Sequence, residues 1–180
     1  GNYFDGSSGE YVPAGSAFAY GTGDFTVEGW FFANSLPTNG SHLFAQTVSG
    51  TNYFLCRAGT AESTPQQKLE FRYATSGGGT AITGTSTFQL NTWNHFAFVR
   101  QSGTVYLYLN GVQGGSGSCS QDFSNTTYNP TIGRATHAAE NLFTGNISNL
   151  RVVKGGALYT SNFTPSTTPL TASVSSGTVS

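Results

Sequence analysis

The strongest constraint on the fold is the run WNHFAFVRQSGTVYLYLNGV at residues 93–112. Two stretches in which side chains alternate between two faces flank a Ser-Gly dipeptide that favours a turn. This pattern is typical of two antiparallel strands joined by a tight turn. With the turn at that dipeptide, Phe96 should oppose Leu109, and Phe98 should oppose Leu107. This face is apolar throughout, so we expect it to pack inward.

The opposite face of the hairpin is amphipathic, with two tyrosines whose rings can pack while their hydroxyls stay hydrated. The run DFTVEGWFFA at residues 24–33 likewise has one apolar face and one amphipathic face. Antiparallel sheets with one core face and one wetter face are typical of a two-sheet sandwich. The side chains expected on the wetter face are Val99 opposite Tyr106, Ala97 opposite Tyr108, His95 opposite Asn110, and Thr26, Glu28 and Trp30 from the second run.

Strand-like runs recur along the chain, separated by stretches rich in Gly, Ser, Asn and Pro that favour turns. We expect an all-β fold: one antiparallel two-sheet β-sandwich domain at residues 1–170, and a polar C-terminal tail or linker at residues 171–180. The stretches SGGGT and GGSGSCSQ are interpreted as turns or loops. The expected strands occupy residues 2–5, 10–14, 24–33, 42–47, 52–58, 68–75, 93–101, 104–112, 129–135 and 144–154.

The composition argues against several classes of partner. Charged residues make up only 8% of the 180 residues, and the net charge is −1, so no electrostatic attraction to nucleic acid or anionic lipid is expected. No apolar run is long enough to span a bilayer. Met is absent from the sequence, which indicates a processed product or part of a longer chain.

Cys56 and Cys119 are the only cysteines. They would allow one disulfide, but the sequence alone does not show that they meet. A buried free thiol at Cys56, which lies in a strand-like run, is the alternative. No further Cys or His lies at metal-ligand spacing, so we predict no metal site of that type.

Hydrolysis of a glycosidic bond requires two carboxyl groups about 5–10 Å apart. Asp24 and Glu28 on one strand would stand about 13 Å apart at about 3.3 Å per residue. Glu70 has no acidic neighbour in the sequence. We therefore predict no catalytic residues, and we expect Glu28 and Glu70 to be solvated on outward strand positions.

Five segments together resemble a known family: YFDGSSGEYV, GTGDFTVEGWF, WNHFAFVRQSGTVYLYLNG, TIGR and FTGNISNLRVVKGGALYTSNFTP. In this order and spacing they resemble the laminin-G-like, concanavalin A-like lectin/glucanase jelly-roll family over about residues 2–170. The ending LRVVKGGALYTSNFTPSTTPLTA is most similar to laminin-G-like domains of phage structural and tail proteins, notably of marine and cyanobacterial phages. The resemblance implies a non-enzymatic adhesion module on a virion surface or outside the cell, within a larger chain or a homo-oligomeric assembly.

Relatives of this kind often hold calcium at the rim of the sandwich through carboxylate, amide and carbonyl oxygens. The stretch TIGRATHAAENLFTGNISNL resembles the pentraxin segment that carries an acidic ligand cluster, but here only Glu140 and Asn141 remain of such a cluster. We therefore predict no cofactor, with calcium as the one alternative. Asp5 in FDGSSG is expected to cap its own turn.

Glycan binding requires aromatic faces together with amides and hydroxyls. We expect a ligand-binding site on the wetter face, and the rim loops at residues 35–42, 57–67 and 135–141 are the alternative. The expected partner is a cell-surface glycan, or neighbouring structural subunits if the module is purely architectural. A third hypothesis is an accessory binding domain of an extracellular enzyme. The predicted ligand-binding residues are Trp30, Tyr106, Tyr108, Glu28 and Asn110.

Overall fold

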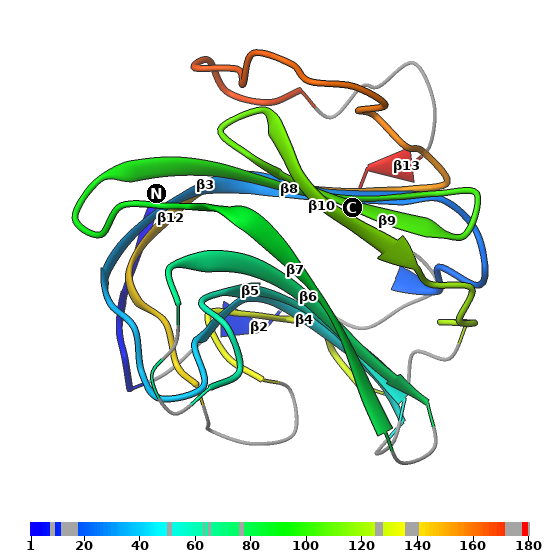
Figure 1. Cartoon of the computed structure of the whole chain (residues 1–180), viewed down its shortest axis with the longest axis horizontal. Coiled ribbons are helices and arrows are strands. Elements are labelled where there is room, and N and C mark those ends of the chain that lie inside the picture. The colour runs from blue at the N-terminus through cyan, green and yellow to red at the C-terminus, as the bar shows by residue number, and fades with distance from the viewer. Residues whose placement is uncertain are drawn as a thin grey trace.

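The structure is a computed structural model that describes residues 1–7, 10–11, 18–49, 52–62, 64, 66–75, 78–124, 128–135, 141–171 and 178–179. These residues form two antiparallel sheets stacked face to face (Figure 1), which confirms the predicted all-β sandwich. Within these ranges no helix has the length and apolarity that crossing a membrane requires. The strands are β1 (Asn2–Asp5), β2 (Glu10–Tyr11), β3 (Phe25–Ser35), β4 (Ser41–Ser49), β5 (Asn52–Ala58), β6 (Lys68–Thr75), β7 (Gly78–Thr87), β8 (Trp93–Gln101), β9 (Thr104–Leu109), β10 (Val112–Ser118), β11 (Thr131–Ile132), β12 (Thr144–Lys154) and β13 (Thr178–Val179).

The first sheet has seven strands in the order β1-β12-β3-β8-β9-β10, with β13 also paired to β12. The second sheet has six strands in the order β2-β11-β4-β5-β6-β7. The two longest strands, β3 and β12, pair with each other along most of their length, with two interruptions of register. Segments far apart in the sequence therefore lie side by side in the seven-stranded sheet.

Phenylalanine dominates the core between the sheets. Phe25 of β3, Phe54 of β5 and Phe71 of β6 are completely buried. The ring of Phe54 stacks on both others, with centroid distances of 5.1 Å to Phe25 and 5.6 Å to Phe71. Each such pair adds about 0.5–1.5 kcal/mol beyond the burial of its area. The two sheets are thus joined through directly stacked aromatic side chains.

The hairpin β8–β9 has the predicted register. Phe96 pairs with Leu109, and Phe98 pairs with Leu107. All four side chains belong to the central core. Both residues of the two-residue turn have positive φ, 48° and 76°, as a type I′ turn requires.

Strands β7 and β10 contain residues 78–80 and 114–118, which belong to the two stretches interpreted as turns or loops, and for these residues that prediction is wrong. They are the edge strands of the two sheets and contact each other. A Cβ added at Gly115 would lie 2.9 Å from the carbonyl oxygen of Thr83, and one at Gly117 would lie 2.7 Å from Cγ1 of Ile82. The glycines that suggested turns therefore permit close approach of two strands.

Residues 155–171, which we call the C-terminal cover, cross the outer face of the seven-stranded sheet (Figure 1, orange). A second apolar cluster lies beneath the cover. The part of the outer face beneath the cover is therefore buried, and there the prediction of a wetter face is wrong. The buried members of the cluster are Ala97, Val99 and Tyr108, packed against Tyr106, Ala157, Tyr159 and Phe163.

Part of the segment expected to be a tail or linker pairs with the sheet. Strand β13 pairs antiparallel with β12, with Thr178 opposite Lys154 and Val179 opposite Val153. Residues 172–177 and 180 lie outside the described residues. The domain boundary at residue 170 stays a prediction.

Cys56 and Cys119 are separate buried thiols. Burial raises the pKa of both thiols. Of the two alternatives that the sequence left open for these residues, the structure contains the free thiols.

Candidate functional site

Glu28 lies at the centre of the covered sheet face and has no solvent exposure. Arg151 of β12 donates to its Oε1 from Nε at 2.8 Å and from Nη2, and the Tyr159 hydroxyl donates to its Oε2 at 2.7 Å. Nε2 of His95 lies 3.4 Å from the same Oε2. The expectation that Glu28 and Glu70 are solvated is wrong, because Glu70 is likewise buried and paired with Arg57.

The charges of this network are fixed by its contacts. Burial alone would raise the pKa of the Glu28 carboxyl, but hydrogen bonds from His95, Tyr159 and Arg151, together with the Arg151 charge, lower it below its usual value. Burial, and then the hydrogen bond to Glu28, raises the pKa of the Tyr159 hydroxyl. Glu28 is therefore a carboxylate at neutral pH, and Tyr159 is a hydrogen-bond donor.

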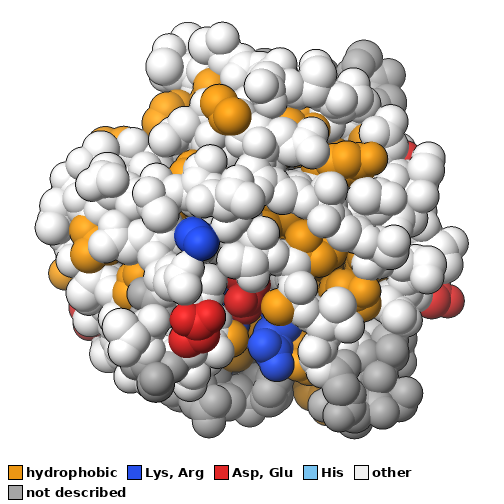
Figure 2. Space-filling view, viewed as in Figure 1, with side chains coloured by type: hydrophobic (Ala, Val, Ile, Leu, Met, Phe, Trp, Pro, Cys, Tyr) orange, Lys and Arg blue, Asp and Glu red, His pale blue; other side chains and the backbone are white. Residues whose placement is uncertain are grey.

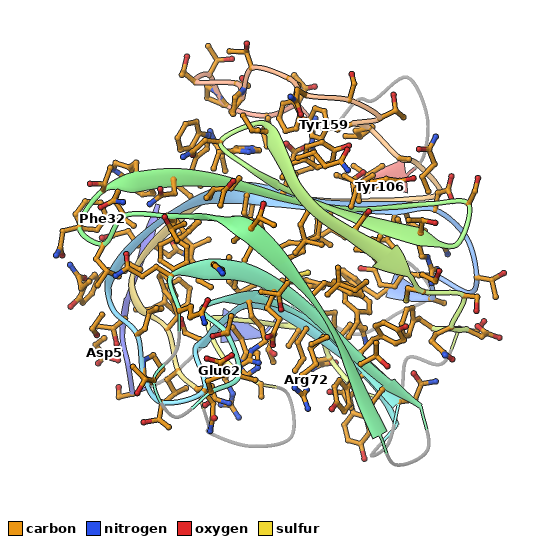
Figure 3. All side chains as sticks on the ribbon, in the orientation of Figure 1. Asp5, Phe32, Glu62, Arg72, Tyr106 and Tyr159 are labelled. Atoms are coloured by element: carbon orange, nitrogen blue, oxygen red, sulfur yellow. The ribbon has the colours of Figure 1, made fainter. Side chains whose placement is uncertain are left out.

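Other contacts hold the C-terminal cover on the sheet. The rings of Tyr159 and Phe163, both in the cover, stack 3.6 Å apart and nearly parallel. The ring of Tyr108 on β9 contacts both, at centroid distances of 6.5 Å and 5.5 Å, and Figure 3 shows Tyr159 on this side of the sheet. The Trp30 indole Nε1 donates to the carbonyl of Ser166 at 3.0 Å. The Tyr108 hydroxyl donates to the carbonyl of Tyr159 at 3.3 Å.

The five predicted ligand residues therefore have different environments. Tyr108 is completely buried, and Tyr106 is half-buried at the border of the covered cluster. Asn110 is exposed, and its Oδ1 accepts the backbone N–H of His95 at 2.7 Å. Trp30 is half-buried and lines a groove at the surface. The structure does not bring the five side chains together in one open site.

The groove beside Trp30, which we call the tryptophan groove, has a volume of about 330 Å³. Trp30 pairs with His95, and Phe32 pairs with Trp93, so the two tryptophans are diagonal neighbours on the outer face of β3 and β8. The polar wall comes from β12, where its pairing with β3 is interrupted, and from the C-terminal cover. The groove is lined by Trp30, Trp93, Ser148, Asn149 and Thr167.

The groove combines an accessible aromatic surface with neutral hydrogen-bonding groups. Trp93 is 44% exposed, and its ring contacts Phe32 at a centroid distance of 5.8 Å. The Trp30 indole donates a hydrogen bond to the Ser166 carbonyl. It also contacts the His95 ring edge to face, with 5.3 Å between the ring centroids. No charged side chain is among the lining residues that the structure describes. A ligand could stack an apolar face on Trp93 and bond to the amide and hydroxyls opposite.

Sequence reasoning missed Trp93 and the polar wall. Trp93 was interpreted only as the start of a strand. Pairing residues 24–33 with residues 93–101 would have placed it diagonally from Trp30, because both sit on the second face of their runs. Ser148, Asn149 and Thr167 have no local signal, since a bulge and a distant segment place them in the groove.

The three rim loops named as the alternative site meet over the six-stranded sheet. Their described residues line one cavity of about 270 Å³, which we call the rim cavity. Residues 63, 65 and 136–140 of these loops lie outside the described residues. The rim cavity is lined by Asn39, His42, Leu55, Arg57, Ala61, Arg72 and Asn141.

The acidic residues considered for calcium serve local structure where they are described. Asp5 caps its own turn, as predicted, because its Oδ1 accepts the N–H of Ser7 at 2.8 Å and the Ser7 hydroxyl at 2.6 Å. Asp122 does the same for the N–H of Ser124 at 2.9 Å. Within the described part of the chain, no three His, Cys, Asp or Glu side chains gather into a group that could hold a metal. Glu140 lies outside the described residues.

Two stacked antiparallel sheets with this strand order define a lectin-like jelly-roll sandwich. A laminin G family model described as the concanavalin A-like lectin/glucanases superfamily matches residues 4–159. The chain therefore belongs to this family, as its sequence motifs implied. A search of curated proteins finds no significant match.

Solved structures with low sequence identity share the fold. Domain 4 of AbnA, a GH43 extracellular arabinanase from Geobacillus stearothermophilus in complex with arabinotriose, has a TM-score of 0.68 at 20% identity, covering 85% of this chain and 69% of that chain. The CBM40 of the Ruminococcus gnavus IT-sialidase, bound to α2,3-sialyllactose, has a TM-score of 0.62 at 14% identity, covering 85% of this chain and 92% of that chain. Domains LG4-5 of the mouse laminin α1 chain have a TM-score of 0.59 at 14% identity, covering 83% of this chain but 40% of that chain.

Proposed function

We propose that the chain is a non-catalytic, extracellular glycan-binding module that holds a neutral sugar in the tryptophan groove. The observation that carries the proposal is the exposed ring of Trp93 in a groove whose other described lining residues include neutral amide and hydroxyl side chains and no charged one. The apolar face of a sugar ring stacks on such an indole, and its hydroxyls bond to neutral polar groups. The groove volume of about 330 Å³ lies within the range of small-ligand sites, about 300–1,000 Å³.

The acidic residues support a binding role rather than hydrolysis. Neither the tryptophan groove nor the rim cavity has two carboxylates among its described lining residues. Glu28 is buried beneath the C-terminal cover in contact with Arg151. A glycosidase would need two carboxyl groups about 5–10 Å apart across an accessible bond.

The structural comparisons also favour glycan binding. Two of the similar structures are parts of carbohydrate-active enzymes and were solved with arabinotriose and sialyllactose. These two complexes favour a module that binds sugars beside a catalytic domain in a longer chain. The comparisons give no support to the phage or virion setting that the sequence resemblance implied, so the proposal is limited to an extracellular module.

The architectural alternative has less support. It requires a broad aromatic sheet face that packs against neighbouring copies, and the C-terminal cover occupies the face that the sequence offered for this. The exposed large hydrophobic side chains of the described residues are Tyr3, Trp93, Val112 and Tyr128.

A glycan array with the purified chain, followed by calorimetry on each responding sugar, tests the proposal. Neutral saccharides should bind, and Trp93→Ala should weaken that binding at least about fivefold, the lower end of the about 1–3 kcal/mol that a nucleobase gains by stacking on an aromatic side chain. Tyr128→Ala is the matched control, because Tyr128 is 41% exposed and does not line the groove. An array without any response, combined with self-association in light scattering, would instead support the architectural alternative.

A further inference from the structure

The rim cavity lies on the outer face of the six-stranded sheet, on the opposite side of the sandwich from the tryptophan groove. Three adjacent strands present its central side chains, because His42 of β4 pairs with Arg57 of β5, and Leu55 of β5 pairs with Arg72 of β6. His42, Leu55 and Arg57 are buried and form the floor, whereas Arg72 is half-buried. The cavity is thus built on paired strands as well as on loops.

One of the two arginines has its charge neutralised within the fold. Nη1 of Arg57 lies 2.6 Å from Oε1 of Glu70, and both side chains are buried. The other carboxylate oxygen, Oε2, accepts the backbone N–H of Ala61 at 3.3 Å. Glu70 is therefore committed to Arg57 and to the loop that follows β5. The Nε of Arg57 is buried and has no hydrogen-bond partner among the described residues.

The charge of Arg72 has no such partner. Among the described residues it forms neither an ion pair nor a hydrogen bond, and its guanidinium lies against the backbone of Gly79, where an added Cβ would be 2.9 Å from Nη2. Burial lowers the pKa of Arg57, and the nearby charge of Arg72 contributes in the same direction. Glu70 thus neutralises Arg57, and it forms no ion pair with Arg72.

Acidic as well as basic side chains lie on this side of the six-stranded sheet (Figure 2 and Figure 3). Figure 2 shows few charged side chains on the face in view, and the small group over the six-stranded sheet contains acidic (red) as well as basic (blue) side chains. Glu62, on the same side of this sheet as Arg72 (Figure 3), is exposed and is not among the residues that line the cavity. The described lining residues include two arginines, one histidine and two asparagines, and no acid is among them.

We propose that the rim cavity binds a sugar that bears a carboxylate, a uronic or sialic acid unit, through the guanidinium of Arg72. A planar guanidinium binds a carboxylate through two parallel charge-assisted hydrogen bonds. The amides of Asn39 and Asn141 supply donors and acceptors for ring hydroxyls, and Leu55 supplies an apolar floor. This second site does not rest on the proposed neutral-sugar site.

Nuclear magnetic resonance titration of the 15N-labelled chain tests the assignment, with glucuronate, N-acetylneuraminate, glucose and acetate as separate probes. One or both acidic sugars should shift the Arg72 Nε–Hε resonance with saturation, and 0.5 M NaCl should weaken the response. Glucose and acetate should produce much smaller shifts. Acetate acting as strongly as the acidic sugars would mean a general anion site and would overturn the assignment to a sugar.

Variants separate this site from the tryptophan groove. Arg72→Gln should weaken acidic-sugar binding at least about tenfold, the equivalent of about 1.4 kcal/mol, and Arg72→Lys should recover only part of it because the planar fork is lost. Asn141→Ala should weaken binding without changing the charge. Lys154→Gln removes one positive charge on β12 of the other sheet and should leave binding unchanged. Loss of binding in Trp93→Ala but not in Arg72→Gln would place the acidic sugar in the tryptophan groove and refute the inference.

Discussion

Glu28 and Arg151 form an ion pair between neighbouring strands β3 and β12, although 123 residues separate them in the sequence. The same carboxylate accepts the hydroxyl of Tyr159 from the C-terminal cover. One buried side chain therefore connects two central strands with the segment packed over them. Removing one partner of a buried charge pair is strongly destabilising, because the other charge stays buried without compensation.

Replacement of Glu28 should test this connection directly. Glu28→Gln should lower the free energy of unfolding at pH 7 by about 3 kcal/mol, in the range for a broken buried pair. Urea denaturation followed by tryptophan fluorescence measures the change. Glu62→Gln, at an exposed position, should stay within about 0.5 kcal/mol of the wild type. Equal changes in the free energy of unfolding for the two substitutions would show that the buried ion pair does not stabilise the fold.

The pH dependence of stability should reveal the same carboxylate. Because the folded protein lowers the pKa of Glu28 below its ordinary value of 4.5, Glu28 contributes stability above that value and loses it as the pH falls toward the folded pKa. The difference in unfolding free energy between wild type and Glu28→Gln should therefore shrink as the pH falls below 4.5. Urea titrations at each pH measure it, and a constant difference would contradict the lowered pKa.

The sequence was sufficient for the features that depend on local alternation and turn chemistry. The register of Phe96 with Leu109 followed from the position of one Ser-Gly turn, because a two-residue turn fixes which residues oppose each other. The inward face of β3 followed from the period of two along a strand. The turn cap of Asp5 followed from its neighbours.

The features that depend on contacts between distant segments could not be predicted from local sequence patterns. Alternation showed that Glu28 and Tyr108 share the second face, but it did not show that residues 155–171 pack on that face. The polar wall of the tryptophan groove comes from a bulge in β12 and from Thr167, neither of which a local pattern near Trp30 reveals. The rim loops were named as an alternative, but Arg72 lies on a strand outside them.

Two adjacent glycines on β10 should respond differently to the same substitution. Gly115→Ala should destabilise the fold by about 1–3 kcal/mol, the range for overpacking, because the new Cβ would lie 2.9 Å from the Thr83 carbonyl oxygen of β7. Gly114→Ala is the matched control, since its Cβ would find only ordinary contacts at 3.5 Å or more. Thermal denaturation of both variants compares them, and equal melting temperatures would mean that the edge strands do not approach as closely as described.

Arg100 should be a further determinant of stability at the opposite end of the hairpin from the tryptophan groove. Its guanidinium is completely buried and donates to the carbonyls of Gly23 at 2.7 Å, Gln121 at 2.8 Å and Gly21 at 2.8 Å. It thus connects the loop before β3 with the segment after β10. Arg100→Met keeps much of the side-chain volume but leaves three carbonyls without their donor, each costing about 1–3 kcal/mol where water does not replace it.

The expected loss in Arg100→Met is therefore about 3 kcal/mol or more in urea denaturation at pH 7. Arg100→Lys should recover little, because one ammonium group does not reproduce the fixed fork of donors or the contact of the guanidinium with the rings of Phe25 and Phe123, at 4.8 and 5.1 Å. Arg72→Met provides the control, since Arg72 has neither a hydrogen bond nor an ion pair among the described residues, and it should change stability by less than about 1 kcal/mol. If Arg100→Met and Arg72→Met unfold at the same urea concentration, the three carbonyl contacts do not hold the two loops together.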